Sequence, residues 1–142
     1  MFILLIHVAA VLFMTGFIWT IQLVHYPLFN RVGDDAFPRY EADHRRLVVL
    51  LVGPGFLITL ITCVLLLFSR PQEVSLSASF AGLLLFAITL VSTARFQAPL
   101  HTRLRDGFDR DAYTFLLATN WIRTAAWSFH AMLALWMVWR VS

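Results

Sequence analysis

Four apolar segments, each about as long as a lipid bilayer is thick, constrain this chain more than any other feature. They run from about Phe2 to His25, from Leu47 to Phe68, from Ala78 to Phe96 and from Trp121 to Trp139. A helix needs roughly 20 apolar residues to cross the hydrocarbon core of a bilayer. Only 13% of the 142 residues are charged, about half the fraction that keeps a soluble surface wet. The sequence therefore predicts one all-α domain over residues 1–142, a four-transmembrane-helix bundle.

The distribution of arginine predicts how this bundle is oriented. Lysine is absent, and nine of the 11 arginines lie in or beside the first and third connections between apolar segments. These nine are Arg31, Arg39, Arg45, Arg46, Arg95, Arg103, Arg105, Arg110 and Arg123. Positive residues stay on the cytoplasmic side, so both termini are expected in the periplasm. We expect membrane lipid and no nucleic acid as a partner, because no soluble domain carries a basic face.

Local signals extend the second and fourth helices beyond the membrane on the cytoplasmic side. Pro38 suits the first turn of a helix, and Asp34 or Asp35 could cap it. Asp109 is a candidate N-cap for a helix that continues into the fourth segment. Pro54, which lies between two glycines, is expected to bend the second helix, either to open a cavity or for packing alone.

A faint internal similarity suggests two repeated helical hairpins. The polar residues of the first half recur in the same order about 75 residues later, and chance similarity between two apolar hairpins is the alternative. The two series are Gln22, His25, Gly33, Tyr40 and His44, followed by Gln97, His101, Gly107, Tyr113 and Asn120.

Three histidines lie at the cytoplasmic ends of three different predicted helices. His25 closes the first apolar segment, His44 precedes the second and His101 follows the third. Glu41 lies three residues before His44, so both side chains project to one side of a helix, as in the Glu-x-x-His pairs of metal-binding bundles. Histidine nitrogens with one carboxylate suit iron, copper or zinc better than magnesium or calcium. His25, Glu41, His44 and His101 are therefore the predicted metal ligands.

Polar residues at the same level complete a candidate active site. Asn120 and Arg123 open the fourth segment and are predicted to orient a substrate, while Tyr40 or Tyr113 supplies a hydrogen bond or a proton. Gln22 shares a face of the first helix with Tyr26. The preferred hypothesis is a metal-dependent membrane enzyme, an oxidoreductase or oxygenase that acts on a lipophilic substrate.

Other interpretations of the histidines stay open. Two histidines from different helices could hold a b-type haem, or the protein could be a non-catalytic subunit or carrier that uses this layer to bind a partner or a lipid headgroup. Histidines at helix ends can also be merely interfacial. His7 and His130 are interpreted as structural, and Cys63, the only cysteine, as a small buried hydrophobe. The sequence does not decide between a monomer, a homo-oligomer and a larger membrane complex.

Several short motifs resemble a known family. They are His25-Tyr26-Pro27-Leu28-Phe29, Phe37-Pro38-Arg39-Tyr40 with His44, Pro99-Leu100-His101 and Asn120-Trp121-Ile122-Arg123-Thr124. In this order they resemble a family of small bacterial four-helix integral membrane proteins, most of unknown function, which is distantly similar to anthrone-oxygenase-like membrane proteins. The resemblance implies a bacterial inner membrane, the four-helix fold and a role for the histidines. The distant relatives oxidise aromatic polyketides with dioxygen, but no catalytic motif of theirs maps onto particular residues of this chain.

Overall fold

The computed structural model describes all 142 residues and contains only helices, grouped into four long rods. The first rod joins α1 to a π turn, η1, and a 3-10 segment, η2; the third joins α3 to a π turn, η3, and α4; α2 and α5 are unbroken. The bounds are α1 Phe2–Thr20, η1 Ile21–His25, η2 Tyr26–Arg31, α2 Phe37–Phe68, α3 Leu76–Ser92, η3 Thr93–Gln97, α4 Ala98–Arg105 and α5 Arg110–Val141. This confirms the predicted all-α, four-helix fold.

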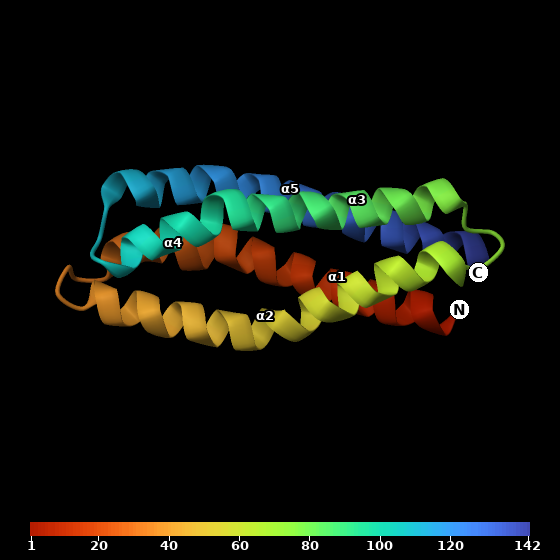
Figure 1. Cartoon of the computed structure of the whole chain (residues 1–142), viewed down its shortest axis with the longest axis horizontal. Coiled ribbons are helices and arrows are strands. Elements are labelled where there is room, and N and C mark those ends of the chain that lie inside the picture. The colour runs from red at the N-terminus through yellow and green to blue at the C-terminus, as the bar shows by residue number, and fades with distance from the viewer.

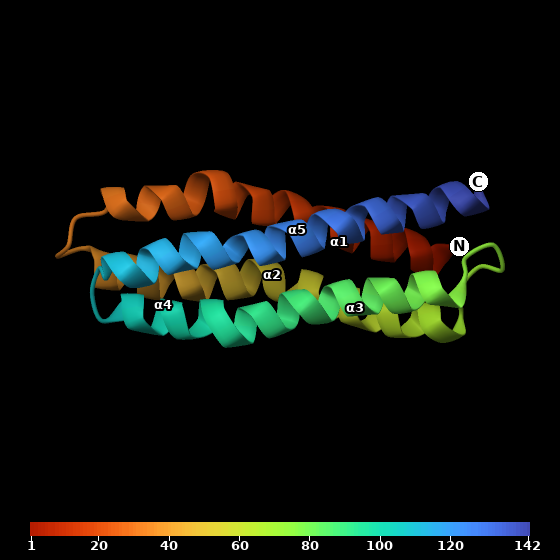
Figure 2. The same cartoon turned by 90° about the horizontal axis from the view of Figure 1, so that it is seen from above.

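The four rods run side by side, with successive rods antiparallel (Figure 1). Contacts join α1 to α2, α2 to α3, α3 to α5 and α5 to α1, so each rod packs against two neighbours. Residues 32–36 and 106–109 connect the rods at one end, here called the Arg-rich end. Both termini and residues 69–75 lie at the opposite end, here called the terminal end (Figures 1 and 2).

Three of the rods are long and apolar enough to cross a membrane: Phe2–Arg31, Phe37–Phe68 and Leu76–Arg105. The fourth, α5, is as long as α2, but its buried face carries His130 and several hydroxyl and amide side chains, which lower its mean hydropathy. Its outer face is apolar, because every exposed residue between Phe115 and Trp139 is Ala, Ile, Leu, Met, Phe or Trp. Polar groups therefore point inward and apolar groups outward, as expected when lipid is the solvent. This arrangement supports an integral membrane protein.

A π turn interrupts the first and the third rod at corresponding places, just before Pro27 and Pro99. A proline cannot donate to the carbonyl four residues earlier, and a wider turn is one way for a helix to accommodate that loss. Two hairpins with the same interruption support the predicted repeat. The two π turns begin 72 residues apart. The polar residues recur after about 75 residues, so the two repeat lengths differ by about one helical turn.

Both extended helices begin close to the predicted positions. Asp109 is the N-cap of α5, and its side chain accepts a hydrogen bond of 2.9 Å from the backbone N–H of Ala112. The other cap prediction is wrong: Ala36 is the N-cap of α2, and no side chain caps that helix. Pro38 in the first turn of α2 has no N–H to leave unpaired, which lowers the need for a cap.

The helix α2 remains continuous through Pro54 and bends near its middle (Figure 1). Pro54 itself is exposed on the outside of the bundle, whereas the next residue, Gly55, is buried. A Cβ at Gly55 would lie 2.7 Å from Sδ of Met14, so the missing side chain lets α1 and α2 approach closely. Toward the Arg-rich end from this crossing, the rods enclose a cavity.

Candidate metal centre

Three of the four predicted metal ligands converge at the Arg-rich end. Glu41, His44 and His101 each offer one ligand atom, and these atoms lie within 4.8 Å of one another. The i, i+3 spacing on α2 brings Glu41 and His44 to one face, and α4 supplies His101 from the neighbouring rod. Nδ1 of His101 lies 2.6 Å from Oε1 of Glu41. The second carboxylate oxygen, Oε2 of Glu41, is buried and has no hydrogen-bond partner.

An unpartnered oxygen on a fully buried carboxylate is costly, because its desolvation is not repaid. A cation bound beside Oε2 would remove that cost. The donor set of one carboxylate and two imidazoles also matches the chemistry of iron, zinc and copper sites. The group Glu41–His44–His101, here called the cavity group, can therefore hold a transition-metal ion.

His25 lies next to this group and contacts only one of its members. Its Nε2 is 2.7 Å from Nδ1 of His44, and the two rings stack with centroids 4.6 Å apart. Tyr40 also stacks on His25, with ring centroids 6.2 Å apart. The structure thus gives His25 the geometry of a residue that orients His44, while its role as a direct ligand stays a prediction.

Tyr26 is the tyrosine that contacts the cavity group directly. Its hydroxyl lies 2.8 Å from Nε2 of His101, and the residue is 2% exposed. Because the Glu41 carboxylate accepts from Nδ1–H of His101, Nε2 carries a lone pair and accepts from the Tyr26 hydroxyl. Carboxylate, imidazole and phenol therefore form one hydrogen-bonded chain from α2 through α4 to the first rod.

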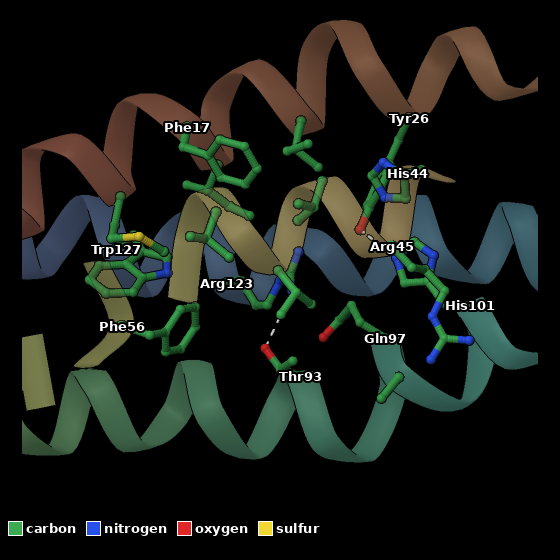
Figure 3. A pocket seen from close by; sticks show the side chains of 17 residues that line it. Phe17, Tyr26, His44, Arg45, Phe56, Thr93, Gln97, His101, Arg123 and Trp127 are labelled. Atoms are coloured by element: carbon green, nitrogen blue, oxygen red, sulfur yellow. Dashed lines mark hydrogen bonds between the residues drawn. The ribbon is translucent and has the colours of Figure 1, made fainter. Parts of the chain in front are cut away.

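A cavity of about 210 Å³ adjoins this chain, lined by 17 residues of which 11 are hydrophobic. Phe17, Phe56 and Trp127 form its apolar half, and Tyr26, His44 and His101 lie at the other side (Figure 3). Two further lining residues, Val49 of α2 and Ala98 of α4, are themselves exposed on the outside of the bundle. The cavity therefore reaches the surface between α2 and α4, where Arg45 also lines it.

Two arginines line the cavity, Arg45 of α2 and Arg123, which projects from α5 (Figure 3). Nε and Nη2 of Arg123 donate to Oδ1 of Asn120 at 2.9 and 2.6 Å, and Nη1 donates to Thr93 at 3.3 Å. Asn120 in turn donates to Oε1 of Gln22 at 2.7 Å. No carboxylate forms a salt bridge with Arg123. The guanidinium is held in place by neutral groups and keeps its positive charge available to a ligand.

A second buried group lies toward the terminal end, where the sequence predicted only structural residues. His7, Cys63 and His130 come from α1, α2 and α5, and their ligand atoms also lie within 4.8 Å of one another. None of them lines the cavity. This group, here called the closed group, is a second place that can hold a metal ion.

No protein-family model, curated protein or solved structure matches this chain. The fold and the two buried groups therefore define it only as a four-helix protein of membrane type with two candidate metal centres. The resemblance to the small bacterial family stays a prediction.

Proposed function

We propose that this protein is a metal-dependent membrane oxidoreductase that takes a small lipophilic substrate into its cavity from the lipid. The observation that carries the proposal is the buried carboxylate of Glu41, which has an unpartnered oxygen beside two imidazoles that line an apolar cavity. Glu41, His44 and His101 would hold the ion, with His25 supporting His44. A bound iron or copper ion would supply one-electron or dioxygen chemistry next to the cavity.

The size and lining of the cavity limit the substrate. A cavity of about 150 Å³ lined by apolar side chains is large enough for benzene, so 210 Å³ fits a single substituted ring or the head of a longer lipid. The aromatic residues Phe17, Phe56 and Trp127 favour a flat ring by stacking or edge contacts. Arg123, without an acidic partner, favours an oxygen substituent that is anionic or strongly polar. A phenol- or quinone-like ring is the class that meets these conditions.

The chain's own residues supply positioning and a proton path. Arg123, fixed by Asn120 and Thr93, would bind the oxygen of the substrate. To bind the ion through Nδ1 beside Glu41, His101 would carry its proton on Nε2 and donate it to the Tyr26 oxygen, and the Tyr26 hydroxyl would then be free to donate into the cavity. Tyr40, the predicted donor, does not line the cavity. Tyr26 is therefore the better-placed phenol.

The geometry does not favour the haem alternative. Two axial imidazoles must face each other across the iron, with about 4 Å between nitrogens if each bond is about 2 Å long. Nε2 of His25 and Nδ1 of His44 lie 2.7 Å apart and share a hydrogen bond. The rings also stack with an interplanar angle of 29°, so no slot for a porphyrin separates them.

The test is metal analysis of the Cys63→Ser variant, in which only the cavity group remains intact, purified in mild detergent. We expect one ion per chain, and loss of that ion in Cys63→Ser/Glu41→Gln/His44→Ala. A redox titration of the metal-loaded variant with a phenol or quinone probe then separates catalysis from carriage. A bound ion that changes neither oxidation state nor spectrum with the probe would support a carrier and overturn the oxidoreductase. Absence of metal and of uptake would overturn the whole proposal.

A further inference from the structure

The closed group, His7, Cys63 and His130, has the composition and spacing of a soft-metal site. Nε2 of His7 and Nε2 of His130 lie 3.2 Å apart, and Sγ of Cys63 lies 4.0 Å from Nε2 of His130. Metal bonds of about 2.0 Å to nitrogen and about 2.3 Å to sulfur put two nitrogens about 3.3–3.5 Å apart and a nitrogen and a sulfur about 3.5–3.7 Å apart. Shifts of a few tenths of an ångström would bring all three atoms onto one ion.

A hydrogen bond outside the group fixes which nitrogen of His7 is free. Oγ1 of Thr62 donates its one hydrogen to the carbonyl of Ile58 at 2.7 Å, so it accepts from Nδ1–H of His7 at 2.9 Å. In a neutral imidazole the other nitrogen, Nε2, then carries a lone pair, and it points toward Cys63 and His130. Support of this kind from a second residue is typical of metal-bound histidines.

Packing fixes the ring of His130, but one of its nitrogens has no hydrogen-bond partner. It is fully buried and stacks on Trp127 at an interplanar angle of 11°, while its Nδ1 has no hydrogen-bond partner. Gly82 of α3 faces the same ring, and a Cβ at this position would lie 3.3 Å from Nε2 of His130. The absence of a side chain at Gly82 keeps the metal-facing edge of the ring uncrowded.

We propose that the closed group binds one Cu(I) ion. Charge decides between the metals that thiolate and imidazole favour, which are Cu(I) and zinc. A thiolate with two neutral imidazoles gives a neutral complex with Cu(I) but a net positive one with Zn²⁺. No Asp, Glu, Lys or Arg belongs to this group, and an uncompensated charge inside a membrane bundle is costly.

Binding of Cu(I) to the closed group needs no oxidant or reductant. Cu(I) replaces the thiol proton of Cys63, so one proton leaves per ion bound and the copper keeps its oxidation state. His130 donates from Nε2 to the lone pair of His7 in the metal-free group; on binding, its ring proton moves to Nδ1. The site is closed because it does not line the cavity. It is therefore a three-coordinate holding site without a place for substrate.

The test is a Cu(I) titration of the purified full chain, under anaerobic reducing conditions, in competition with a coloured Cu(I) chelator. We expect the wild type and Arg95→Gln, a substitution at an exposed residue outside both buried groups, to take up Cu(I) at the closed group with equal affinity. Cys63→Ser should lose this binding. X-ray absorption of the loaded protein should show one sulfur and two nitrogen neighbours.

Two threonine variants test the site independently, in case Cys63→Ser loses Cu(I) binding only because it misfolds. Thr62→Val removes the acceptor for His7 and should weaken Cu(I) binding roughly 10- to 100-fold. Thr59→Val changes the same residue type one turn away, where the hydroxyl bonds only to the carbonyl of Gly55, and should leave the affinity unchanged. Equal affinity in wild type, Cys63→Ser and Thr62→Val would overturn the proposal, as would an absorption spectrum without sulfur.

Discussion

The two buried groups use the same side chain, histidine, in opposite surroundings. The cavity group combines two imidazoles with a carboxylate, lies at the Arg-rich end and faces a cavity that contains Arg123. The closed group combines two imidazoles with a thiol, lies toward the terminal end and is sealed by packing. Trp127 separates them, because it lines the cavity and stacks on His130.

This difference shows what makes a buried histidine available for chemistry. At the closed group the hydrogen bonds of His7 run to Thr62 and His130, so its ring is fixed between helices. At the cavity group, Nε2 of His44 has no protein partner and His44 lines the cavity. An ion at the closed group would be shielded, whereas an ion at the cavity group could meet a substrate.

Removing His101 should have the largest effect. His101→Ala deletes one ligand and leaves the buried carboxylate of Glu41 without its partner, which costs roughly 3–5 kcal/mol of stability. We expect loss of the cavity-group metal and a clear decrease in unfolding free energy, measured by denaturant titration in detergent micelles. Unchanged stability would show that the hydrogen bond between Glu41 and His101 does not stabilise the fold.

Replacing Arg123 should separate ligand binding from metal binding. Arg123→Gln keeps a hydrogen-bond donor but removes the charge, and a lost charged hydrogen bond of about 1.5–3 kcal/mol corresponds to a roughly 10- to 100-fold weaker affinity. The measurement is calorimetric binding of a halogenated phenolate, with Arg95→Gln as control because Arg95 is exposed outside the cavity. Equal affinities in the two variants would remove Arg123 from the site.

Removing the hydroxyl of Tyr26 should have a smaller effect, and the same change at Tyr40 serves as its control. Tyr26→Phe removes the hydroxyl that His101 accepts and should destabilise the protein by about 1–2 kcal/mol, while lowering metal affinity at the cavity group. Tyr40→Phe keeps the ring that stacks on His25 and should change metal affinity little. Elemental analysis after dialysis against a weak chelator measures both. A larger loss in Tyr40→Phe would restore Tyr40 to the role predicted from the sequence.

The smallest effect is expected at the N-terminus of α5. The hydrogen bond from the backbone of Ala112, with one from Arg103, lowers the pKa of the Asp109 carboxyl. A lowered pKa in the folded state adds stability that is present above the unfolded-state pKa and is lost as the pH falls through the folded-state pKa. Melting temperature against pH should therefore fall on the acid side in the wild type. In Asp109→Asn, which still caps the helix, that part of the pH dependence should be absent; an identical profile would contradict it.

The fold and the cavity group could be read from the sequence because their signals are local. Apolar segment lengths predicted the rods, and the spacing of Glu41 and His44 along one helix predicted a shared face. Other contacts depend on how far one helix is shifted along its neighbour. These are the contact of Tyr26 with His101 and the meeting of His7, Cys63 and His130. One chain does not encode that register in any short pattern. The one available signal was the cost of isolated polar groups within apolar segments, which favours their pairing across helices.

The most direct test of this account is the metal content of Cys63→Ser compared with Cys63→Ser/Glu41→Gln/His44→Ala, after identical loading and washing. The account predicts one transition-metal ion per chain in the first protein, bound through nitrogen and oxygen, and none in the second. Equal metal content in both, or none in either after loading, would show that the buried carboxylate and imidazoles are a hydrogen-bonded packing cluster and not a metal centre.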